Sequence, residues 1–308
     1  MTGALPFISI IMPNWNGRDY TLRCLDSIAA VDYPLDRIEI IIADNGSTDG
    51  SVEAIRSKFS ELHRFGFRRL VLITIGYNAG APAAYNRCLD ELSQDSDIVL
   101  KIDNDTLLEH SALSEIADGF CSHASVGIVG ARMVSYSDPE MLIHGPGFLH
   151  PLTLAAYFEN ENQDVPRLCD FVNGAGMAIR AGLIRKYRLR FAEEYFLYWD
   201  DTDFCASVKQ LGYQVLYWPR AIVRHAISAS AGKTTMNPRR AYYYLRGRLL
   251  FATRHGTLTQ KIGFLLPYFF FGCHISALKA AFSSGSEGVY AIYRACFDVL
   301  TGRLGKQL

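Results

Sequence analysis

The sequence predicts an α/β fold with a mostly parallel central sheet flanked by helices, followed by a helical C-terminal extension. Two observations support this prediction. In the first third of the chain, short apolar runs alternate with longer segments of helical spacing, and strands that are apolar on both faces are typical of parallel sheets built from βαβ units. After about residue 225, basic and aromatic residues replace this alternation and lead into an uncharged segment at 262–278.

The expected elements follow in order along the chain. Strands are predicted at 7–12, 38–43, 70–75 and 98–102, and helices at 20–30, 48–59 and 82–92. The second part is less regular, with strands at 126–131, 215–218 and 222–224, a helix at 201–211, hairpin and loop at 139–166, and a turn at 173–176 inside an apolar run. Helices between buried strands favour a sheet that is covered on both faces.

Composition excludes several classes of protein. Of the 308 residues, 49% are hydrophobic and 20% are charged, which excludes a disordered chain. Lys+Arg and Asp+Glu both number 31, so the chain lacks the basic excess of a nucleic-acid-binding protein. The seven cysteines form no C-x-x-C pair and are expected to be reduced, buried thiols. The first apolar run has no basic region before it and is interpreted as a strand rather than a secretion signal.

Each of the first four predicted strands ends in a polar cluster. The clusters are Pro-Asn-Trp-Asn at 13–16, Asp-Asn-Gly-Ser at 44–47, Tyr-Asn-Ala-Gly at 77–80 and Asp-Asn-Asp-Thr at 103–106. Turn formation alone explains Asn, Asp and Gly at such positions. Because the carboxyl ends of parallel strands meet at one edge of the sheet, where ligands bind in these folds, we expect the clusters to form one shared ligand site.

Asp103 and Asp105 form the strongest single motif. Positions i and i+2 at the end of a strand point the same way, so both carboxylates can face one ligand. Neighbouring carboxylates repel each other unless a cation lies between them, and Mg²⁺ or Mn²⁺ prefers such oxygen ligands. His225 ends a later predicted strand and is a candidate third ligand, although a lone histidine is more often structural.

Asp200 and Asp201 follow the aromatic run at 195–199 and open a predicted helix. An N-cap and a favourable first-turn acid explain one of them. They do not explain three acids, with Asp203, behind aromatic side chains that we expect to be exposed. A carboxylate beside apolar rings has a raised proton affinity and can act as a general base.

Together these motifs resemble the family 2 glycosyltransferases, which are inverting enzymes with the GT-A fold. The matching segments span residues 7 to 225 and are ISIIMPNWNG, IIADNGSTDGS, GYNAGAPAAYNRCL, KIDNDT, VNGAGMAIR and FLYWDDTDFCASVKQLGYQVLYWPRAIVRH. The Trp-Asp-Asp form is most similar to bacterial rhamnosyltransferase and galactofuranosyltransferase members. The tail segments AYYYLRGRLLFATRHG and YRACFDVLTGRLG resemble the C-terminal extension of rhamnosyltransferase-like members.

The resemblance implies a role for each matching residue. Asp201 would be the catalytic base, and a divalent cation, Mg²⁺ or Mn²⁺, would be bound by Asp103, Asp105 and His225. Residues of the nucleotide-sugar pocket would be Pro13, Asn14, Asn16, Asp44, Asn45, Asn78, Gly80, Asp103 and Asn104. The acceptor would contact Gly176, Trp199 and Asp200.

The expected function is metal-dependent, inverting transfer of one sugar to a hydroxyl of a lipid-linked or cell-surface polysaccharide acceptor. We favour L-rhamnose from a dTDP donor slightly over galactofuranose or another UDP-sugar. A sugar nucleotidyltransferase would need a Gly-rich, basic N-terminal loop, and 13–18 offers only Gly17 and Arg18. An inactive nucleotide-sugar-binding subunit is the third alternative. The multi-span channel of processive polymer synthases is absent from the sequence.

The expected domains are a catalytic domain at 1–225, with a nucleotide-binding half at about 1–105 and an acceptor-binding half at about 106–225, and an extension at 226–308. The extension contains many Arg and Lys residues but only two acids, Glu287 and Asp298. Segment 262–278 is interpreted as an interfacial helix, ahead of a buried core helix or a true membrane span. We therefore expect peripheral or monotopic contact with anionic lipid at the cytoplasmic face of the membrane. A homo-oligomer formed through the extension is also considered. Gly232-Lys233-Thr234 resembles the end of a phosphate-binding loop but lacks its first glycine.

Overall fold

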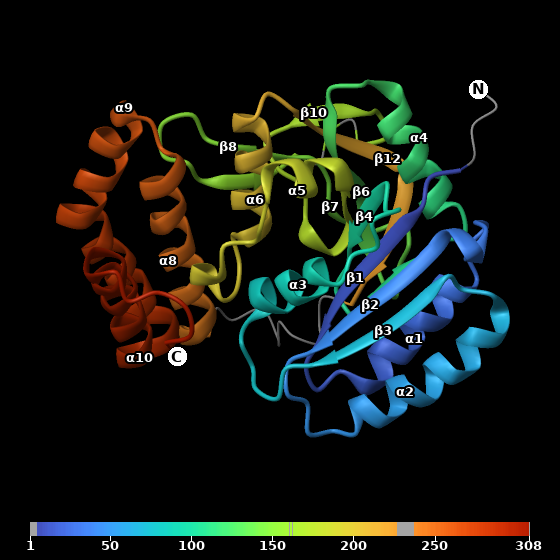
Figure 1. Cartoon of the computed structure of the whole chain (residues 1–308). Helices are drawn as coiled ribbons and strands as arrows, with labels where there is room; N and C mark the ends of the chain where they lie inside the picture. Colours follow the sequence, from blue (N-terminus) through green and yellow to red (C-terminus); the bar gives the residue numbers. More distant parts are fainter. Residues whose placement is uncertain (1–4, 160, 162, 227–236, 308) are drawn as a thin grey trace.

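The computed structural model describes residues 5–159, 161, 163–226 and 237–307. Gly232-Lys233-Thr234 and most of the start of the expected extension lie outside these residues. Figure 1 shows a central sheet with helices on both faces and a separate group of C-terminal helices beside it. The main sheet has the strand order β10-β12-β6-β11-β4-β1-β2-β3, with β5 next to β12 and β7 next to β6. The predicted α/β class of fold, a sheet between helices, is confirmed, but the sheet is mixed and only the part formed by β1, β2, β3 and β4 is parallel throughout.

The first half of the sheet is parallel throughout, as the sequence predicts. Its strands are β1 (Ile8–Asn14), β2 (Ile38–Asp44), β3 (Arg69–Thr74) and β4 (Ile98–Lys101). The connecting helices are α1 (Arg18–Ala29), α2 (Ser51–Leu62) and α3 (Ala81–Asp90). β2 and β4 both pair in parallel with β1, and β3 pairs in parallel with β2.

Alternate strand residues face two different hydrophobic clusters, which explains why these strands are apolar on both faces. Ile8, Ile10 and Met12 pack with α1, α2 and α4 (Ala112–Ser122) on one side of the sheet. Ile11 packs on the other side with α3, α5 (Ala181–Tyr187) and α6 (Asp200–Gln210).

Six of the seven cysteines are buried and all seven are free thiols.

The second half of the sheet is mixed. Its strands are β5 (Thr106–Leu108), β6 (Val126–Ser135), β7 (Leu142–His144), β10 (Arg167–Cys169), β11 (Met177–Arg180) and β12 (Gln214–His225). β11 runs antiparallel between β4 and β6, whereas β12 is parallel to β6. The hairpin of β8 (Gly147–Leu149) and β9 (Ala156–Phe158) lies within the region where the sequence predicts one.

One element differs from the sequence-based expectation. Instead of two short strands at 215–218 and 222–224, the chain forms the single strand β12, whose pairing with β6 shifts register between Trp218 and Ile222. Pro219 lies at this shift, where a residue without an N–H group is tolerated. The local pattern at Pro219 marks an irregularity and not the end of a strand.

The C-terminal extension is helical in the described residues. It contains α8 (Pro238–His255), α9 (Leu258–Gln260), the π-helical turns η5 (Lys261–Leu265) and η6 (Tyr268–Gly272), and α10 (Cys273–Thr301). The run Leu258–Thr301 is long and apolar enough, by length and composition, to cross a membrane. It is not straight, because Gly285 has a φ of 62° and a ψ of −149°. Beyond this kink the chain doubles back, so that His274 Nδ1 and the Tyr293 hydroxyl are 2.9 Å apart.

The extension shares a hydrophobic cluster with the segment that precedes α6. Ala192, Tyr195, Phe196 and Trp199 belong to this cluster together with residues of α8 and α10. Figure 1 shows α8 (orange) standing next to α6. A domain boundary at residue 225, which stays a proposal, therefore separates segments that are packed together.

We predict that Gly130→Ala destabilises the sheet. A Cβ at Gly130, in the middle of β6, would lie 2.2 Å from Val172 Cγ1, and such overpacking typically costs about 1–3 kcal/mol. Urea unfolding measures the loss. The matched control is Gly182→Ala in α5, where a Cβ meets nothing within 4 Å and where alanine is expected to be neutral or to stabilise by roughly 0.5–1 kcal/mol. Equal stability of the two variants would contradict this account of the packing.

Candidate active site

The polar residues that follow β1, β2 and β4 form one hydrogen-bonded network. The side chain of Asn14 donates from Nδ2 to Asp44 Oδ2 over 2.6 Å. Asn14 Oδ1 accepts hydrogen bonds from Thr21 Oγ1 and Asn104 Nδ2 at 2.7 and 3.2 Å. Since Asn14 and Asp44 are register partners of the parallel strands β1 and β2, the predicted convergence of strand ends is confirmed here.

Asp44 is buried and its carboxylate is fully used by the chain itself. Oδ1 accepts from the backbone N–H groups of Gly46 and Ser47, at 3.1 and 2.9 Å. Oδ2 accepts from Asn14 and from the Ser47 hydroxyl, the latter at 2.6 Å. A carboxylate offers about four acceptor positions, so a hydrogen bond from a ligand to Asp44 requires one of these contacts to open. In this conformation Asp44 fixes the turn after β2.

The turn after β3 contains Asn78 and Gly80 and contacts two other parts of the site. Asn45 Nδ2 donates to the Gly80 carbonyl over 3.1 Å, and the Gly80 N–H donates to Asn78 Oδ1 over 3.0 Å. Gly80 has a φ of 93°, and a Cβ there would lie 2.7 Å from the Phe196 ring. Both the conformation and this close approach require glycine.

Two further candidates lie at the edge of this network. Asn16 has a φ of 51° and accepts the Thr48 N–H at Oδ1 over 2.8 Å. Pro13 is a register partner of Ala43 at the end of β1. Both residues therefore border the same strand ends as Asn14.

Asp103, Asp105 and His225 come together although they are far apart in sequence. β5 pairs antiparallel with the end of β12, and this places His225 opposite Thr106. His225 Nε2 lies 3.1 Å from Asp105 Oδ1 and 3.7 Å from Asp103 Oδ2. One possible ligand atom from each residue lies within 4.8 Å of the other two. Two carboxylates and an imidazole form a donor set that suits Mn²⁺ or Mg²⁺.

The charges in this cluster shift the protonation of its members. Although burial opposes a charge on the ring, hydrogen bonds with Asp103 and Asp105 raise the pKa of His225 to about 10. Burial acts to raise the pKa of Asp103, but the hydrogen bond with His225 and the charge of Lys101 hold this pKa well below its usual value. The two carboxylates thus attract positive charge strongly, and a bound cation would compete with the proton on His225.

Asp201 lies in the first turn of α6 and faces the turn Gly174–Gly176. Its Oδ2 accepts the Gly174 N–H over 2.9 Å and its Oδ1 accepts the Thr202 N–H over 2.7 Å. The predicted turn is a short 3₁₀ helix capped by Asn173, whose Oδ1 accepts the Ala175 N–H. The hydrogen bond from Gly174 holds the Asp201 carboxylate at the start of β11, which lies beside the end of the antiparallel strand β4.

Asp200 is only 7% exposed. Burial raises the pKa of its carboxyl to about 7, and the nearby charges of Asp201 and Asp103 act in the same direction, whereas Lys101 acts against them. The raised proton affinity that the sequence predicts for this acid pair is therefore present at Asp200.

The acceptor candidates Gly176 and Trp199 are both buried. A Cβ at Gly176 would lie 3.1 Å from Val223 Cγ2, and Trp199 packs against Phe251 with 5.4 Å between the ring centroids. The expectation that the aromatic run before Asp200 is exposed is wrong for Tyr195, Phe196 and Trp199, because α8 covers them. Their part in acceptor binding stays a prediction.

Sequence reasoning missed Lys101. This residue ends β4, is 4% exposed, and places Nζ 4.1 Å from the centre of the Tyr85 ring. The Tyr85 hydroxyl in turn donates to Asp103 Oδ1 over 2.6 Å. The sequence offers one signal for this placement. Lys101 ends an otherwise apolar strand two positions before Asp103, and side chains at positions i and i+2 of a strand point to the same side.

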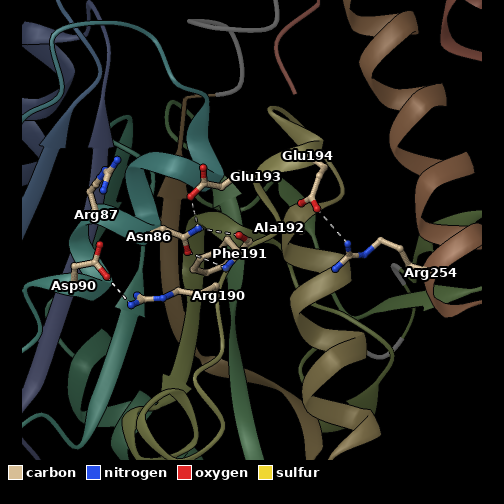
Figure 2. Close-up of a pocket in the computed structure, with 9 residues that line it drawn as sticks. All are labelled: Asn86, Arg87, Asp90, Arg190, Phe191, Ala192, Glu193, Glu194 and Arg254. Atoms are coloured by element: carbon tan, nitrogen blue, oxygen red, sulfur yellow. Dashed lines mark hydrogen bonds and ion pairs between the residues drawn. The ribbon is translucent and has the colours of Figure 1, made fainter. Parts of the chain in front are cut away.

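A hollow lies between α3 and the segment before α6 (Figure 2). Asn86 holds the backbone of Phe191 there, donating to its carbonyl and accepting from its N–H over 2.9 Å each. Arg190 and Asp90 form an ion pair across the hollow, as drawn in Figure 2. Asp103, Asp105 and His225 do not line it, so it is distinct from the metal-type cluster.

We predict that Asp200→Asn stabilises the protein increasingly as the pH rises from about 4 to 7, and most above pH 7. Folding raises the pKa of this carboxyl, so the folded state holds its proton more tightly than the unfolded chain does. The free energy of unfolding therefore falls as the pH rises from about 4 to 7 and the proton is lost. A pKa difference of one corresponds to about 1.4 kcal/mol. The substitution is therefore expected to raise the free energy of unfolding by roughly 1–4 kcal/mol at pH 8 and by little at pH 4. Unfolding in urea at both pH values checks this, with the exposed Asp36→Asn as control. A gain that does not depend on pH would contradict the assignment.

Comparisons with known proteins agree with this geometry. Residues 9–188 match the model of the family described as Glycosyl transferase family 2. The N-acetylglucosaminyl-diphospho-decaprenol L-rhamnosyltransferase of Mycobacterium tuberculosis is 22% identical over 261 residues, which cover 76% of this chain and 79% of that protein. Glycosyltransferase AglE of Haloferax volcanii is 32% identical over 93 residues, 30% of this chain and 29% of AglE. The chain thus matches less than a third of AglE.

Solved structures show the same fold at low sequence identity. The mannosyltransferase PcManGT of Pyrobaculum calidifontis, solved with GDP-Man and Mn²⁺, is 18% identical with a TM-score of 0.63, covering 97% of this chain and 88% of that one. TarS 1-349 of S. aureus, solved with UDP-GlcNAc, is 17% identical with a TM-score of 0.56, covering 96% and 82%. With more than half of its residues matched by the family model, the chain belongs to glycosyl transferase family 2 and is a glycosyltransferase with the GT-A fold.

Proposed function

We propose that this enzyme transfers one sugar, with inversion, from a nucleotide-diphosphate sugar to an acceptor hydroxyl. One observation carries the proposal: the cluster of Asp103, Asp105 and His225 is close to the buried Asp200 and its partly buried neighbour Asp201. Asp201 and Asp103 both act on the protonation of Asp200. The first group suits a diphosphate bound through a cation, and the second suits removal of a proton from an acceptor.

A divalent cation, Mg²⁺ or Mn²⁺, fits the three ligand atoms, and when bound it would neutralise charge on the diphosphate leaving group. The nucleotide would lie along the strand ends at Pro13, Asn14, Asn16, Asp44, Asn45, Asn78, Gly80 and Asn104. The network of Asn14, Asp44 and Asn104 supports this, because it holds polar groups from three strands in one fixed arrangement.

Asp201 would act as the general base. The acceptor oxygen forms a bond to the anomeric carbon, the bond from that carbon to the diphosphate oxygen breaks, and the acceptor proton passes to the Asp201 carboxylate. Its hydrogen bonds from the Gly174 and Thr202 N–H groups orient the carboxylate and leave lone pairs for that proton. Asp200, Trp199 and Gly176 would shape the acceptor side.

The donor is proposed to be dTDP-L-rhamnose, with a UDP-sugar such as UDP-galactofuranose as the alternative. The rhamnosyltransferase of M. tuberculosis supports this choice, since it aligns with about three quarters of the chain. Its name also supports a lipid-linked acceptor, whereas GgaA of Bacillus subtilis, which is 29% identical over 121 residues, is named for minor teichoic acid biosynthesis. An acceptor of the bacterial cell envelope, lipid-linked or polysaccharide, is therefore proposed.

We predict that Asp201→Asn reduces transfer by at least about 100-fold, since general base catalysis typically contributes 10²–10⁴-fold. The measurement is release of free nucleoside diphosphate after donor, acceptor and Mn²⁺ are mixed, using dTDP-L-rhamnose, UDP-GlcNAc and GDP-mannose as donors. Nucleotide affinity, read from the thermal shift with and without Mn²⁺, is expected to stay nearly unchanged.

The exposed Asp36→Asn is the matched control for this substitution. Unchanged turnover in Asp201→Asn would remove Asp201 as the base. Stabilisation by a nucleotide that persists after the metal is chelated would contradict binding through the cation. Release of pyrophosphate instead of nucleoside diphosphate would identify a nucleotidyltransferase.

We also propose that the extension lies on a membrane, at its cytoplasmic face. One side of the helical run after Leu258 packs inward through residues such as Phe264 and Ala277, while the other side is apolar and exposed. We call this exposed side the apolar stripe. Its members recur at helical spacing, and each is more than half exposed: Ile262, Leu266, Phe270, Phe271, Ile275, Leu278 and Phe282. Lys261 precedes these residues and Lys279 lies among them, between Leu278 and Phe282, and both charges suit anionic lipid.

We predict that Phe271→Glu combined with Phe282→Glu abolishes vesicle binding. Both rings are highly exposed, at 71% and 87%, and a charge opposes their insertion into lipid. Flotation with phosphatidylglycerol-containing vesicles measures binding, and pure phosphatidylcholine vesicles should bind less. Phe65→Glu, on an exposed ring beside α2, is the control. Wild-type binding by the double variant would exclude the membrane role, and a change in oligomeric state instead would assign the stripe to contact between copies.

A further inference from the structure

The segment that leads into Asp200 has an unusual backbone. Phe196, Tyr198 and Trp199 have φ values of 62°, 63° and 70°, in the left-handed region that residues other than glycine rarely adopt. Such conformations persist only where the surrounding structure holds them. We refer to residues 193–199 as the acid-loop, because α6 and its two carboxylates begin directly after it.

Arg246 of α8 provides a large part of this support. Its side chain is fully buried, and Nη2 donates to the backbone carbonyls of Tyr195 and Glu194 over 2.7 and 3.0 Å. Nη1 donates to the Gly305 carbonyl over 2.6 Å. The rigid fork of a guanidinium group can satisfy carbonyls in several directions at once, which an ammonium group does less well.

Within the described residues no carboxylate forms an ion pair with Arg246, although its Nη1 donates over 3.3 Å to the Tyr242 hydroxyl, which itself donates to Asp298. The guanidinium instead lies over the rings of Tyr242 and Tyr243, at 5.2 and 4.8 Å from their centroids. A buried charge that is held by backbone carbonyls and ring faces depends on the exact position of those carbonyls. The conformation of the acid-loop and the placement of Arg246 therefore depend on each other.

In two other contacts α8 packs closely against the acid-loop. Gly247 lies so close to Trp199 that a Cβ would come within 2.6 Å of its Cδ1. The rings of Tyr243 and Phe196 stack with 5.2 Å between centroids. On its other side Phe196 accepts the Ala81 N–H at the start of α3, over 3.1 Å. The loop is thus held between α8 and the nucleotide-binding half.

We propose that Arg246 and Gly247 are positioning residues for the transfer reaction, and that the extension sets the conformation of the acid-loop and hence the placement of Asp200 and Asp201. A simple anchor would need only side-chain packing against the catalytic part. Here the guanidinium binds the main chain of the loop, at the carbonyls five and six residues before Asp200. The catalytic consequence rests on the proposed function, in which Asp201 is the base, whereas the structural part does not.

Hydrogen–deuterium exchange of the full-length protein tests the structural part without any substrate. The amides of Phe196, Leu197 and Asp203 donate within the segment to Glu193, Tyr195 and Trp199, so they should exchange slowly in the wild type. Arg246→Met should speed exchange across 194–203 by at least tenfold, with Arg246→Lys in between. The control is Arg248→Met on the same helix, because Arg248 donates to the Thr153 carbonyl instead. Equal protection of 194–203 in both methionine variants would overturn the proposal.

Gly247→Ala covers the case in which Arg246 variants fail to fold. It removes no hydrogen bond but forces Trp199 to move, whereas Gly263→Ala, where a Cβ meets nothing within 4 Å, serves as control. We expect faster exchange of 194–203 in Gly247→Ala alone. Exchange identical to that of Gly263→Ala would overturn the role of Gly247.

Turnover then tests the catalytic part with the donor that the wild type uses. In Arg246→Lys and Gly247→Ala, kcat should fall by about ten- to a hundredfold, with a much smaller change in the donor KM. Wild-type kcat despite faster loop exchange would overturn the positioning role. If Asp201→Asn keeps full activity while the exchange results hold, the general base is wrong and the contact between α8 and the loop stands.

Discussion

The charge balance around Asp103 and Asp105 is the constraint on which the site depends. Two carboxylates at the end of a buried strand repel each other, and positively charged side chains lie on either side of them. Lys101 ends the same strand, and His225 arrives from β12 within 3.1 Å of Asp105. Asp200, which is buried nearby, has its pKa raised to about 7, mainly by burial. Burial disfavours several negative charges so close together, and a bound cation would neutralise them. The site is therefore suited to bind a cation.

Two parts of the site are held in different ways. At the ends of β1 and β2 the polar side chains bind one another, as in the contacts of Asp44 with Asn14 and Ser47. The acid-loop, which contains left-handed residues, is instead held by contacts with α8. The extension therefore has two faces with different tasks. One face packs on the loop before α6, and the other carries the exposed apolar stripe.

Local pattern was sufficient for much of the fold. The four parallel strands and their helices were predicted within a few residues, because strands that are buried on both faces leave unmistakable apolar runs. The local pattern did not predict β12 as one strand, because Pro219 interrupts the apolar pattern although the strand continues on both sides of it. It also failed for the aromatic run before Asp200, since the exposure of a ring depends on which distant helix covers it. Lys101 was missed because one charge at a strand end is usually solvated.

The sequence by itself determined the fold class, the polar strand ends and the residue types of the site, because the spacing of apolar residues and the turn-forming clusters are local properties. Only the tertiary structure decided that His225 lies beside Asp105, that Lys101 enters the acidic site, and that Arg246 holds the loop before Asp200. Lys101 precedes Asp103 by only two residues, but its burial depends on the packing around the strand. The other two contacts join segments that are far apart in the chain. They form through the pairing of β5 with β12 and the packing of α8, neither of which follows from local periodicity.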